Sequence, residues 1–170
     1  MSKAEIRIIP FEMKYLNDYH RGFNAEITKY QWPDPCQHIE DTEALLAMLL
    51  EEMKKGETLL YSILSEEGAF LGSVEVHGLS EDCPELGAWI IEMEQNKGYA
   101  YEALNKVLHD VCSNHHKTEF YYEVDIRNKG SIRLLQKLED QFEIIKREFE
   151  EVITESGKEL KLQGYVLKYK

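Results

Sequence analysis

Hydrophobic positions recur along this chain with two different periods. Between residues 99 and 112 they lie three or four residues apart, which is typical of an amphipathic helix with one buried face. These positions are Ala100, Ala103, Leu104, Val107, Leu108, Val111 and Cys112. Similar patterns predict helices over residues 11–23, 39–55 and 128–138. Gly56 is placed to end the second of these helices.

Alternating or short continuous apolar runs predict seven β-strands. They cover residues 5–10, 58–64, 69–79, 85–91, 119–126, 142–153 and 160–169. Pro33 and Pro35 exclude a helix around them in the irregular segment 24–38. The predicted order is β-α-α-β-β-β-α-β-α-β-β, an α/β (α+β) arrangement. No internal repeat or linker divides the chain, so we expect residues 1–170 to form a single domain.

Composition places the chain among ordinary globular proteins. Hydrophobic residues make up 43% and charged residues 31% of the 170, and no stretch approaches the roughly 18 apolar residues of a membrane span. The first residues lack the apolar run of a signal peptide. Cys36, Cys83 and Cys112 are odd in number and show no paired spacing, so we expect reduced thiols. These features predict a cytoplasmic protein without membrane contacts.

The net charge of −12 narrows the choice of partners. It argues against nucleic acid, whose phosphates would be repelled. It is compatible with a cationic acceptor such as an amine, and equally with plain solubility. The grouping of His109, Cys112, His115 and His116 has no second cluster of metal ligands, and Cys112 lies on the apolar helix face. We therefore expect no metal.

The segment Gln95–Ala100 carries the most specific pattern in the chain. It follows the predicted strand 85–91, contains Gly98, and precedes the helix that begins at Tyr99. A strand–turn–helix of this kind directs backbone N–H groups to one side, at the positive end of a helix dipole, which suits a phosphate or diphosphate. A simple strand–helix connection that contains a glycine is the alternative interpretation.

Written as Gln95-x-x-Gly98-x-Ala100, the segment resembles the acetyl-CoA signature of the GNAT N-acetyltransferases, Gln/Arg-x-x-Gly-x-Gly/Ala. The order of predicted elements also matches that family, and the resemblance is strongest from Glu85 to Leu138. It implies the GNAT fold, a mixed central β-sheet of about seven strands flanked by about four helices. In length and pattern the chain is most similar to the subgroup that includes the ribosomal-protein-alanine N-acetyltransferases.

The resemblance implies an acetyl-CoA site in this region. The diphosphate would lie on backbone N–H groups of Gln95, Lys97, Gly98, Tyr99 and Ala100. A side chain at position 98 would keep the backbone away from the phosphates. The pantetheine arm would pair with the strand before the turn, at Ile90 and Ile91 with Met93 close behind. An N–H of this strand would then stabilise the oxyanion that forms on the thioester carbonyl.

A second family element, Asn-x-x-Ser, appears here as Asn128-Lys129-Gly130-Ser131. By resemblance Asn128 contacts the pantetheine arm and Ser131 lies near the CoA sulfur, although Asn128 also suits a helix N-cap alone. Leu135 is near the position of a Tyr that protonates the leaving thiolate in many relatives, so Ser131 is the candidate acid. Relatives end this helix with Leu-Gly-Phe. This chain has Leu138-Glu139-Asp140-Gln141-Phe142, which predicts a different helix exit.

An amine must lose a proton before it attacks a thioester, and a carboxylate commonly serves as the base. Glu85 begins the strand before the turn and is the candidate that the resemblance favours. Glu75 and His77, on the preceding strand, are the rival candidates. The acceptor pocket is expected to include three residues of the irregular segment 24–38, namely Tyr30, Trp32 and Asp34.

The resemblance therefore implies an acetyl-CoA-dependent N-acetyltransferase. A primary amine, on a small molecule or a protein N-terminus, would attack the thioester directly in a ternary complex. The alternative is a regulatory module that binds acetyl-CoA and no longer turns over, because the usual Tyr is missing. A scaffold that binds no acetyl-CoA is disfavoured by the intact turn. The family often dimerises, so a homodimer is also an expectation.

Overall fold

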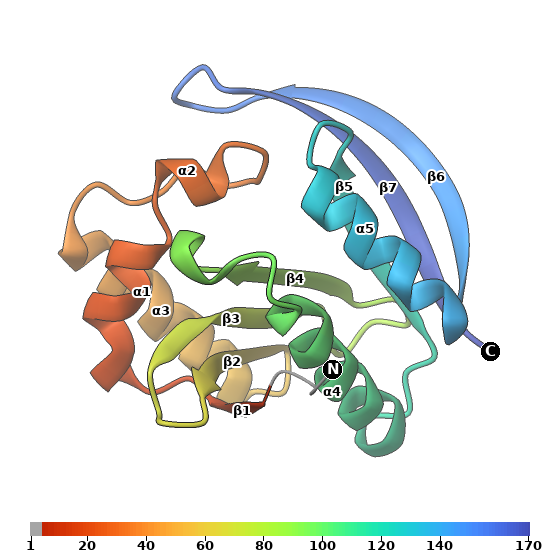
Figure 1. Cartoon of the computed structure of the whole chain (residues 1–170), viewed down its shortest axis with the longest axis horizontal. Coiled ribbons are helices and arrows are strands. Elements are labelled where there is room, and N and C mark those ends of the chain that lie inside the picture. Colours follow the sequence, from red (N-terminus) through yellow and green to blue (C-terminus); the bar gives the residue numbers. More distant parts are fainter. Residues whose placement is uncertain (1–4) are drawn as a thin grey trace.

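The computed structural model describes residues 5–170, which form one seven-stranded sheet with helices on both faces. The strands are β1 (Ile6–Pro10), β2 (Thr58–Ser65), β3 (Phe70–His77), β4 (Glu85–Ile90), β5 (Glu119–Asp125), β6 (Phe142–Ile153) and β7 (Glu159–Tyr169). They lie in the order β1-β2-β3-β4-β5-β7-β6, as Figure 1 shows. Neighbours pair antiparallel except β4 and β5, which are parallel. The mixed sheet that the sequence predicted is confirmed.

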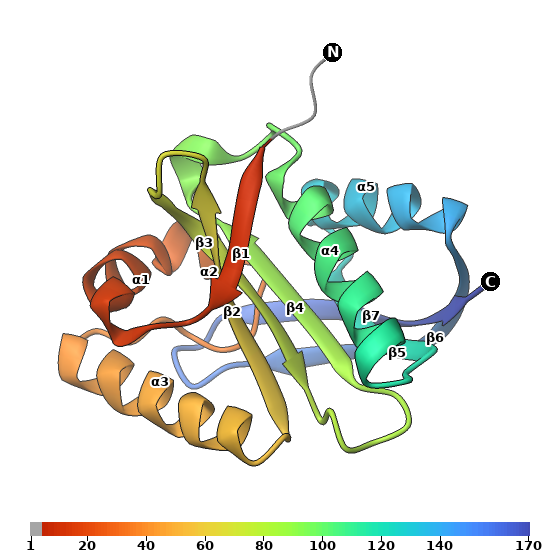
Figure 2. The ribbon, with the colours of Figure 1, turned by 90° about the horizontal axis from the view of Figure 1, so that it is seen from below.

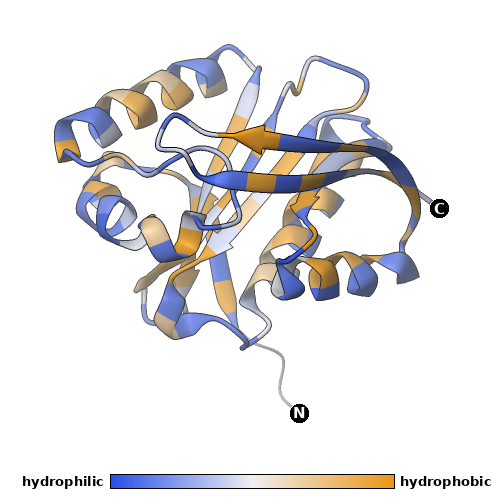
Figure 3. Ribbon diagram, turned by 90° about the horizontal axis from the view of Figure 1, so that it is seen from above, coloured by the Kyte–Doolittle hydropathy of each residue, from blue (hydrophilic) through white to orange (hydrophobic). Residues whose placement is uncertain are grey.

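Within residues 5–170, five α-helices accompany the sheet. They are α1 (Leu16–Gly22), α2 (Ala25–Thr28), α3 (Ile39–Lys54), α4 (Tyr99–Asn114) and α5 (Lys129–Lys137). Figure 2 shows α1 and α3 on one side of the sheet, with α4 and α5 on the other. Each face has its own hydrophobic cluster, one around Leu46 and Trp89 and one around Leu104 and Phe120. In Figure 3 hydrophobic and hydrophilic residues occupy different sides of the helices, as their sequence periods predict.

The structure differs from the sequence prediction at several element ends. The helix expected over residues 11–23 begins as a 3-10 turn, η1 (Met13–Tyr15), before α1. The segment expected to be irregular contains α2, because Asn24 accepts a hydrogen bond from Ile27 N at 3.1 Å and caps a short helix. Ile126, expected in a strand, lies beyond β5 and is 49% exposed.

The exit from α5 passes through a 3-10 turn, η3 (Leu138–Asp140), where the sequence departs from the Leu-Gly-Phe of relatives. Leu138 is fully buried there. The chain therefore leaves α5 through this turn and does not need the glycine that relatives have after the corresponding leucine. A further 3-10 turn, η2 (Glu92–Glu94), follows β4. The three cysteines are free thiols. Within residues 5–170, no helix has both the length and the apolar character that a membrane span requires.

The parallel strands β4 and β5 separate soon after they begin. They share one register pair, Glu85 with Tyr121, next to a hydrogen bond of 2.8 Å from Tyr121 N to the oxygen of Pro84. In contrast, all seven residues of β5 pair with β7 on its other side. The sheet is therefore open between the end of β4 and the end of β5 (Figure 1). This opening positions the candidate site.

Candidate functional site

The turn before α4 leaves space for a ligand at its glycine. Gly98 is the N-cap of α4 and has φ +85°, a left-handed conformation that favours glycine. A Cβ built on Gly98 would meet no atom within 4 Å. The N–H groups of the first helical turn have no partner within the helix, so they are available to an anion here. Gln95 Nε2 donates to the oxygen of Ile90 at 3.2 Å and ties the turn to β4.

A cavity of about 790 Å³ lies over this turn. It brings together most of the residues expected to bind acetyl-CoA, namely Ile90, Gln95, Gly98, Tyr99, Ala100, Asn128 and Ser131. Three others lie outside its lining. Met93 is 87% exposed, Lys97 pairs with Glu94 at 2.8 Å, and Ile91 packs against the cluster of α1 and α3.

The backbone pattern of β4 separates Ile90 from Ile91. The N–H of Ile91 donates to the oxygen of Leu71 at 2.8 Å and is therefore occupied by the neighbouring strand β3. Since N–H directions alternate along a strand, those of Ile90 and Ala88 point the other way, toward the opening beside β5. Among the predicted strand positions, Ile90 is thus the one whose N–H can meet a pantetheine arm.

The lining of this cavity carries an excess of positive charge. Five basic side chains face two acidic ones; they are Lys29, Arg127, Lys129, Arg133 and Lys137 against Glu26 and Glu94. These cations were not among the site residues predicted from the sequence. A signal was present, because Lys129, Arg133 and Lys137 are four residues apart and so share one face of α5. A ligand with several phosphates, such as CoA, fits this charge and the open glycine.

A second cavity, of about 690 Å³, has the opposite character. Six carboxylates line it, namely Glu52, Glu75, Glu85, Glu123, Asp125 and Glu150. Among the described residues that line it, none is Lys or Arg. The two cavities share Tyr30, Gln31, Ala88, Trp89, Asn128 and Ser131, so they meet where β4 and β5 separate. A basic cavity and an acidic cavity therefore adjoin across the opening in the sheet.

The three candidate bases all line the acidic cavity, but they have different partners. Burial, reinforced by the nearby charge of Glu123, raises the pKa of Glu85, while His77 opposes the shift. Within residues 5–170, the Glu85 carboxylate forms no hydrogen bond or ion pair. Glu75 has both oxygens engaged, by Tyr19 at 3.1 Å and by His77 at 2.8 Å. Of the two candidate carboxylates, Glu85 is thus the one that is free to accept a proton from a substrate.

Asn128 and Ser131 lie at the start of α5, where both cavities meet. Asn128 Oδ1 accepts a hydrogen bond from Ser131 N at 3.2 Å, which confirms Asn128 as the N-cap. Leu135 is buried in the core at 5% exposure and cannot reach a ligand. Tyr122, which lies within the strand predicted over residues 119–126, lines the acidic cavity beside Ser131. Burial raises the pKa of this phenol, and Ser131 opposes the shift.

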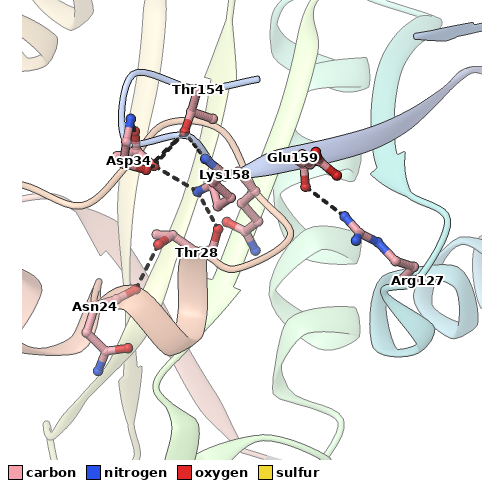
Figure 4. Close-up of polar contacts among 9 residues, drawn as sticks. Asn24, Thr28, Asp34, Arg127, Thr154, Lys158 and Glu159 are labelled. Atoms are coloured by element: carbon pink, nitrogen blue, oxygen red, sulfur yellow. Dashed lines mark hydrogen bonds and ion pairs between the residues drawn. The ribbon is translucent and has the colours of Figure 1, made fainter. Parts of the chain in front are cut away.

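The three predicted acceptor residues fall in different places. Tyr30 lines both cavities, and the Arg127 guanidinium carbon lies 5.0 Å from the centroid of its ring. Trp32 lines the acidic cavity and is 57% exposed. Asp34 lines neither cavity. It joins this loop to the turn between β6 and β7 instead (Figure 4).

The contacts of that turn hold the loop from both sides. Asp34 accepts hydrogen bonds from Thr154 Oγ1 at 3.1 Å and from Ser156 Oγ at 2.8 Å. Lys158 Nζ donates to the oxygens of Thr28 at 2.7 Å and Gln31 at 2.8 Å, and it pairs with Asp34 at 3.3 Å. Burial alone would raise the pKa of Asp34, but the hydrogen bonds from Ser156, Thr154 and Lys158 outweigh it and lower the pKa.

Of the residues weighed as metal ligands, His109 and Cys112 lie in α4, while His115 and His116 follow its end. Within residues 5–170, no group of three or more His, Cys, Asp or Glu side chains is arranged to hold a metal ion.

Solved structures with the same fold include several acetyltransferases. A spermidine N-acetyltransferase from Vibrio cholerae, in complex with CoA and spermine, has a TM-score of 0.80 and 16% identity over 96% of this chain and 95% of its own. A ribosomal-protein-S5-alanine acetyltransferase from Vibrio fischeri has a TM-score of 0.80 and 13% identity over 99% and 96%. A ribosomal L7/L12 α-N-protein acetyltransferase in complex with CoA has a TM-score of 0.81 and 14% identity over the same shares.

At these identities the structures establish the fold alone. No curated protein sequence matches the chain. The family model described as "Acetyltransferase (GNAT) domain" matches residues 5–139, which is most of the chain. The matched range includes β4 and α5, which line both cavities, and α4, which lines the basic one. The chain therefore belongs to the GNAT acetyltransferase family.

Proposed function

We propose that this protein transfers the acetyl group of acetyl-CoA to a primary amine of a small cationic molecule. The observation that carries the proposal is the meeting of a basic and an acidic cavity at the opening between β4 and β5. An anionic acetyl donor fits one side, and a cationic acceptor fits the other. The shared residues, Ala88 and Trp89 among them, lie where the two substrates would meet.

In the basic cavity, the protein's residues would bind acetyl-CoA and orient its thioester. Backbone N–H groups of Gly98, Tyr99 and Ala100 would bind the diphosphate, and the cations of α5 would add charge attraction. The Ile90 N–H would pair with the pantetheine arm. Ser131, at the start of α5, is the proposed donor of a proton to the departing thiolate. Acetyl-CoA supplies the thioester that the amine attacks.

On the acceptor side, the carboxylates attract the amine and Glu85 removes its proton. An ammonium group is not nucleophilic, so one proton must leave before attack. Glu85 is the proposed base because its carboxylate is unpaired and lines the acidic cavity. Direct attack in a ternary complex follows, since both substrates reach the same opening in the sheet.

The charge of the acidic cavity also favours one acceptor class. Several carboxylates without Lys or Arg among them suit an acceptor that keeps a positive charge besides the reacting amine. The Vibrio cholerae relative was crystallised with spermine, a compound of this kind. A protein N-terminus, as in the ribosomal-protein acetyltransferases, needs only one cationic group, so we place it second.

The buried Leu135 supports a second candidate function. The acid that many relatives use is replaced by a core residue here, as a regulatory module without turnover would permit. Such a module would bind acetyl-CoA in the same cavity and acetylate no amine.

Calorimetric titration with acetyl-CoA tests the donor site. Gly98→Glu should abolish binding, because a carboxylate would occupy the space for the diphosphate. Gly56→Glu is the matched control: Gly56 also has positive φ, at +76°, and also has no atom within 4 Å of a built Cβ, but it lies outside both cavities. No binding by the wild type would contradict the proposal.

A panel of amines then separates the two candidates. It should hold spermine, spermidine, an aminoglycoside and a peptide with N-terminal alanine, with release of the CoA thiol as readout. Acetylation of the first three ahead of the peptide would support the small cationic acceptor. Binding of acetyl-CoA without transfer to any amine would favour the regulatory module.

A further inference from the structure

Three side chains that line the acidic cavity, Tyr19, Glu75 and His77, are joined by hydrogen bonds, and the last of them is the register partner of Glu85. Tyr19 Oη donates to Glu75 Oε1 at 3.1 Å, and Nε2 of His77 lies 2.8 Å from Glu75 Oε2. Tyr19 is 2% exposed and packs edge-on against Trp89 with ring centroids 5.2 Å apart. Glu75 is therefore held at both oxygens, from a fixed phenol on one side and an imidazole on the other.

The register of the sheet places His77 next to Glu85. The two residues are direct partners in the antiparallel pair of β3 and β4. Directly opposed residues share one face of the sheet, with Cβ atoms about 5 Å apart. Glu75 lies two residues from His77 on β3 and so faces the same side. All three side chains line the acidic cavity.

The ring of His77 is oriented so that one nitrogen stays free. A carboxylate only accepts hydrogen bonds, so Nε2–H of His77 donates to Glu75, and a neutral ring then carries its lone pair on Nδ1. Within residues 5–170, Nδ1 has no hydrogen-bond partner. The side chain is 38% exposed, which gives the ring access to solvent. His77 can thus accept a proton on Nδ1 and lose it to water.

The reaction needs such an outlet. An ammonium substrate and acetyl-CoA give an amide, a CoA thiol and one net proton. Glu85 takes a proton from the ammonium group in every turnover, so it must pass that proton on before the next one. Glu85 is exposed at the start of β4, and the base directly opposite it in the sheet is His77, whose Nδ1 has no hydrogen-bond partner within residues 5–170.

We propose that His77 takes the proton from Glu85, directly or through one water, and releases it to solvent. In the first step the O–H bond of Glu85 breaks as an Nδ1–H bond forms on His77; in the second, that bond breaks and a water or buffer base takes the proton. Glu75 and Tyr19 are positioning residues that hold the ring. This inference rests on the proposed acetyl transfer. It assigns Glu75 and His77, the rival candidate bases, to positioning and proton release and not to deprotonation of the amine.

The charges around the ring fit this role. Glu75 on β3, Glu85 on β4 and Glu52 on α3 face His77, and Glu123 on β5 faces Glu85. The hydrogen bond with Glu75 raises the pKa of His77, burial opposes the rise, and the charges of Glu85 and Glu52 add to it. Burial likewise raises the pKa of Glu85. Both pKa values are thus raised, and the imidazole is by its ordinary pKa the stronger base of the two, so transfer from Glu85 to His77 is the favoured direction.

Rescue by an added base tests the relay. The assay measures CoA release with acetyl-CoA and spermine, and with the best amine of the panel if spermine is not acetylated. His77→Ala should lower kcat by about tenfold or more, with KM nearly unchanged, and imidazole in the buffer should restore much of kcat. His109→Ala is the matched control, since His109 is exposed on α4 outside both cavities, and it should behave as wild type.

Each outcome supports or overturns the relay. Full activity of His77→Ala without imidazole would overturn it and leave the proposed function intact. A loss that imidazole does not restore, accompanied by weaker acetyl-CoA binding in calorimetry, would show that His77 only supports the structure. A wild-type protein that acetylates no amine of the panel would overturn the proposed function and the relay with it.

Discussion

Gly87 lies directly opposite Glu75 across β4 and β3, and a Cβ at Gly87 would meet no atom within 4 Å. The space above Gly87 therefore belongs to the acidic cavity, between Glu85 and Trp89 on the same face of β4. This relationship gives a way to block the acceptor side alone.

Gly87→Leu should fill the acceptor space and lower kcat/KM for spermine by roughly tenfold or more, about 1.4 kcal/mol of binding. Acetyl-CoA affinity should stay at the wild-type value, because Gly87 does not line the basic cavity. Steady-state kinetics and calorimetry measure the two effects. Gly87→Ala is the control, since a methyl group fits the open space. Equal loss of acetyl-CoA binding in Gly87→Leu would contradict the assignment of the two cavities.

Glu85→Gln should lower kcat by about 100-fold, the scale of a lost general base. The wild-type rate should rise with pH, because the carboxylate acts only when unprotonated. Burial raises the pKa of Glu85, so this rise should lie above the ordinary glutamate pKa of about 4.3. The rise should vanish in the variant, as a pH series of kcat would show. A variant with wild-type kcat would exclude Glu85 as the base.

The cations of α5 should contribute to acetyl-CoA affinity through charge. Lys129→Gln with Arg133→Gln should raise Kd by about three- to tenfold, on the scale of exposed ion pairs. It should also weaken the dependence of Kd on salt. Lys54→Gln with Lys55→Gln removes the same charge from the end of α3, outside both cavities, and should leave Kd unchanged. An equal rise in Kd in both double variants would show that the net charge of the protein, and not the position of the α5 cations, determines acetyl-CoA affinity.

Asp34→Asn should loosen the loop that carries Tyr30 and Trp32. The amide cannot keep the ion pair with Lys158 or accept at both positions as the carboxylate does. We expect KM for the acceptor to rise several-fold, on the scale of one lost charged hydrogen bond, while acetyl-CoA affinity is kept. Thermal denaturation should show a lower Tm than wild type. A KM equal to that of wild type would mean that the loop does not shape the acceptor pocket.

The stability that the Asp34 carboxylate contributes should depend on pH in a defined direction. The folded pKa of Asp34 is lower than its unfolded value, so its contribution to stability is present above the unfolded pKa and is lost as pH falls through the folded pKa. The difference in Tm between wild type and Asp34→Asn should therefore shrink in acid. A constant difference would show that the carboxylate charge is not what stabilises the loop.

Periodicity was enough to predict the sheet and its main helices. The apolar stripe of α4 and the alternation in the strands encode which faces are buried, and the structure has all seven predicted strands. The short helix α2 was missed because its single turn depends on the cap from Asn24 and carries too few residues to show a period. Family membership was also predicted correctly from the Gln95–Ala100 turn.

The site could be predicted only where its residues are adjacent in sequence. The turn at Gly98 and the cap at Asn128 are local patterns, and both lie at the cavities. The contact between Asp34 and Thr154 joins residues 120 positions apart, and no local pattern encodes it. The Glu75–His77 pair was visible as two candidate bases, but their hydrogen bond and the register with Glu85 depend on how β3 and β4 align. The roles of Ser131, Tyr30 and Trp32 stay predictions, as do a homodimer and a cytoplasmic location.

The single register pair between β4 and β5 also bears on how the protein unfolds. Within residues 5–170, strands β1 to β4 pair with strands β5 to β7 only at Glu85 and Tyr121, although one hydrophobic cluster packs against both parts of the sheet. Few backbone hydrogen bonds join the two parts at the opening, so they can separate locally there more easily than strands that are fully paired. A substrate that occupies the opening would bridge them, and its binding energy would add to the stability of both. Amide hydrogen exchange should then slow on both sides of the opening when acetyl-CoA binds, including amides of β5 and β7 that no substrate touches.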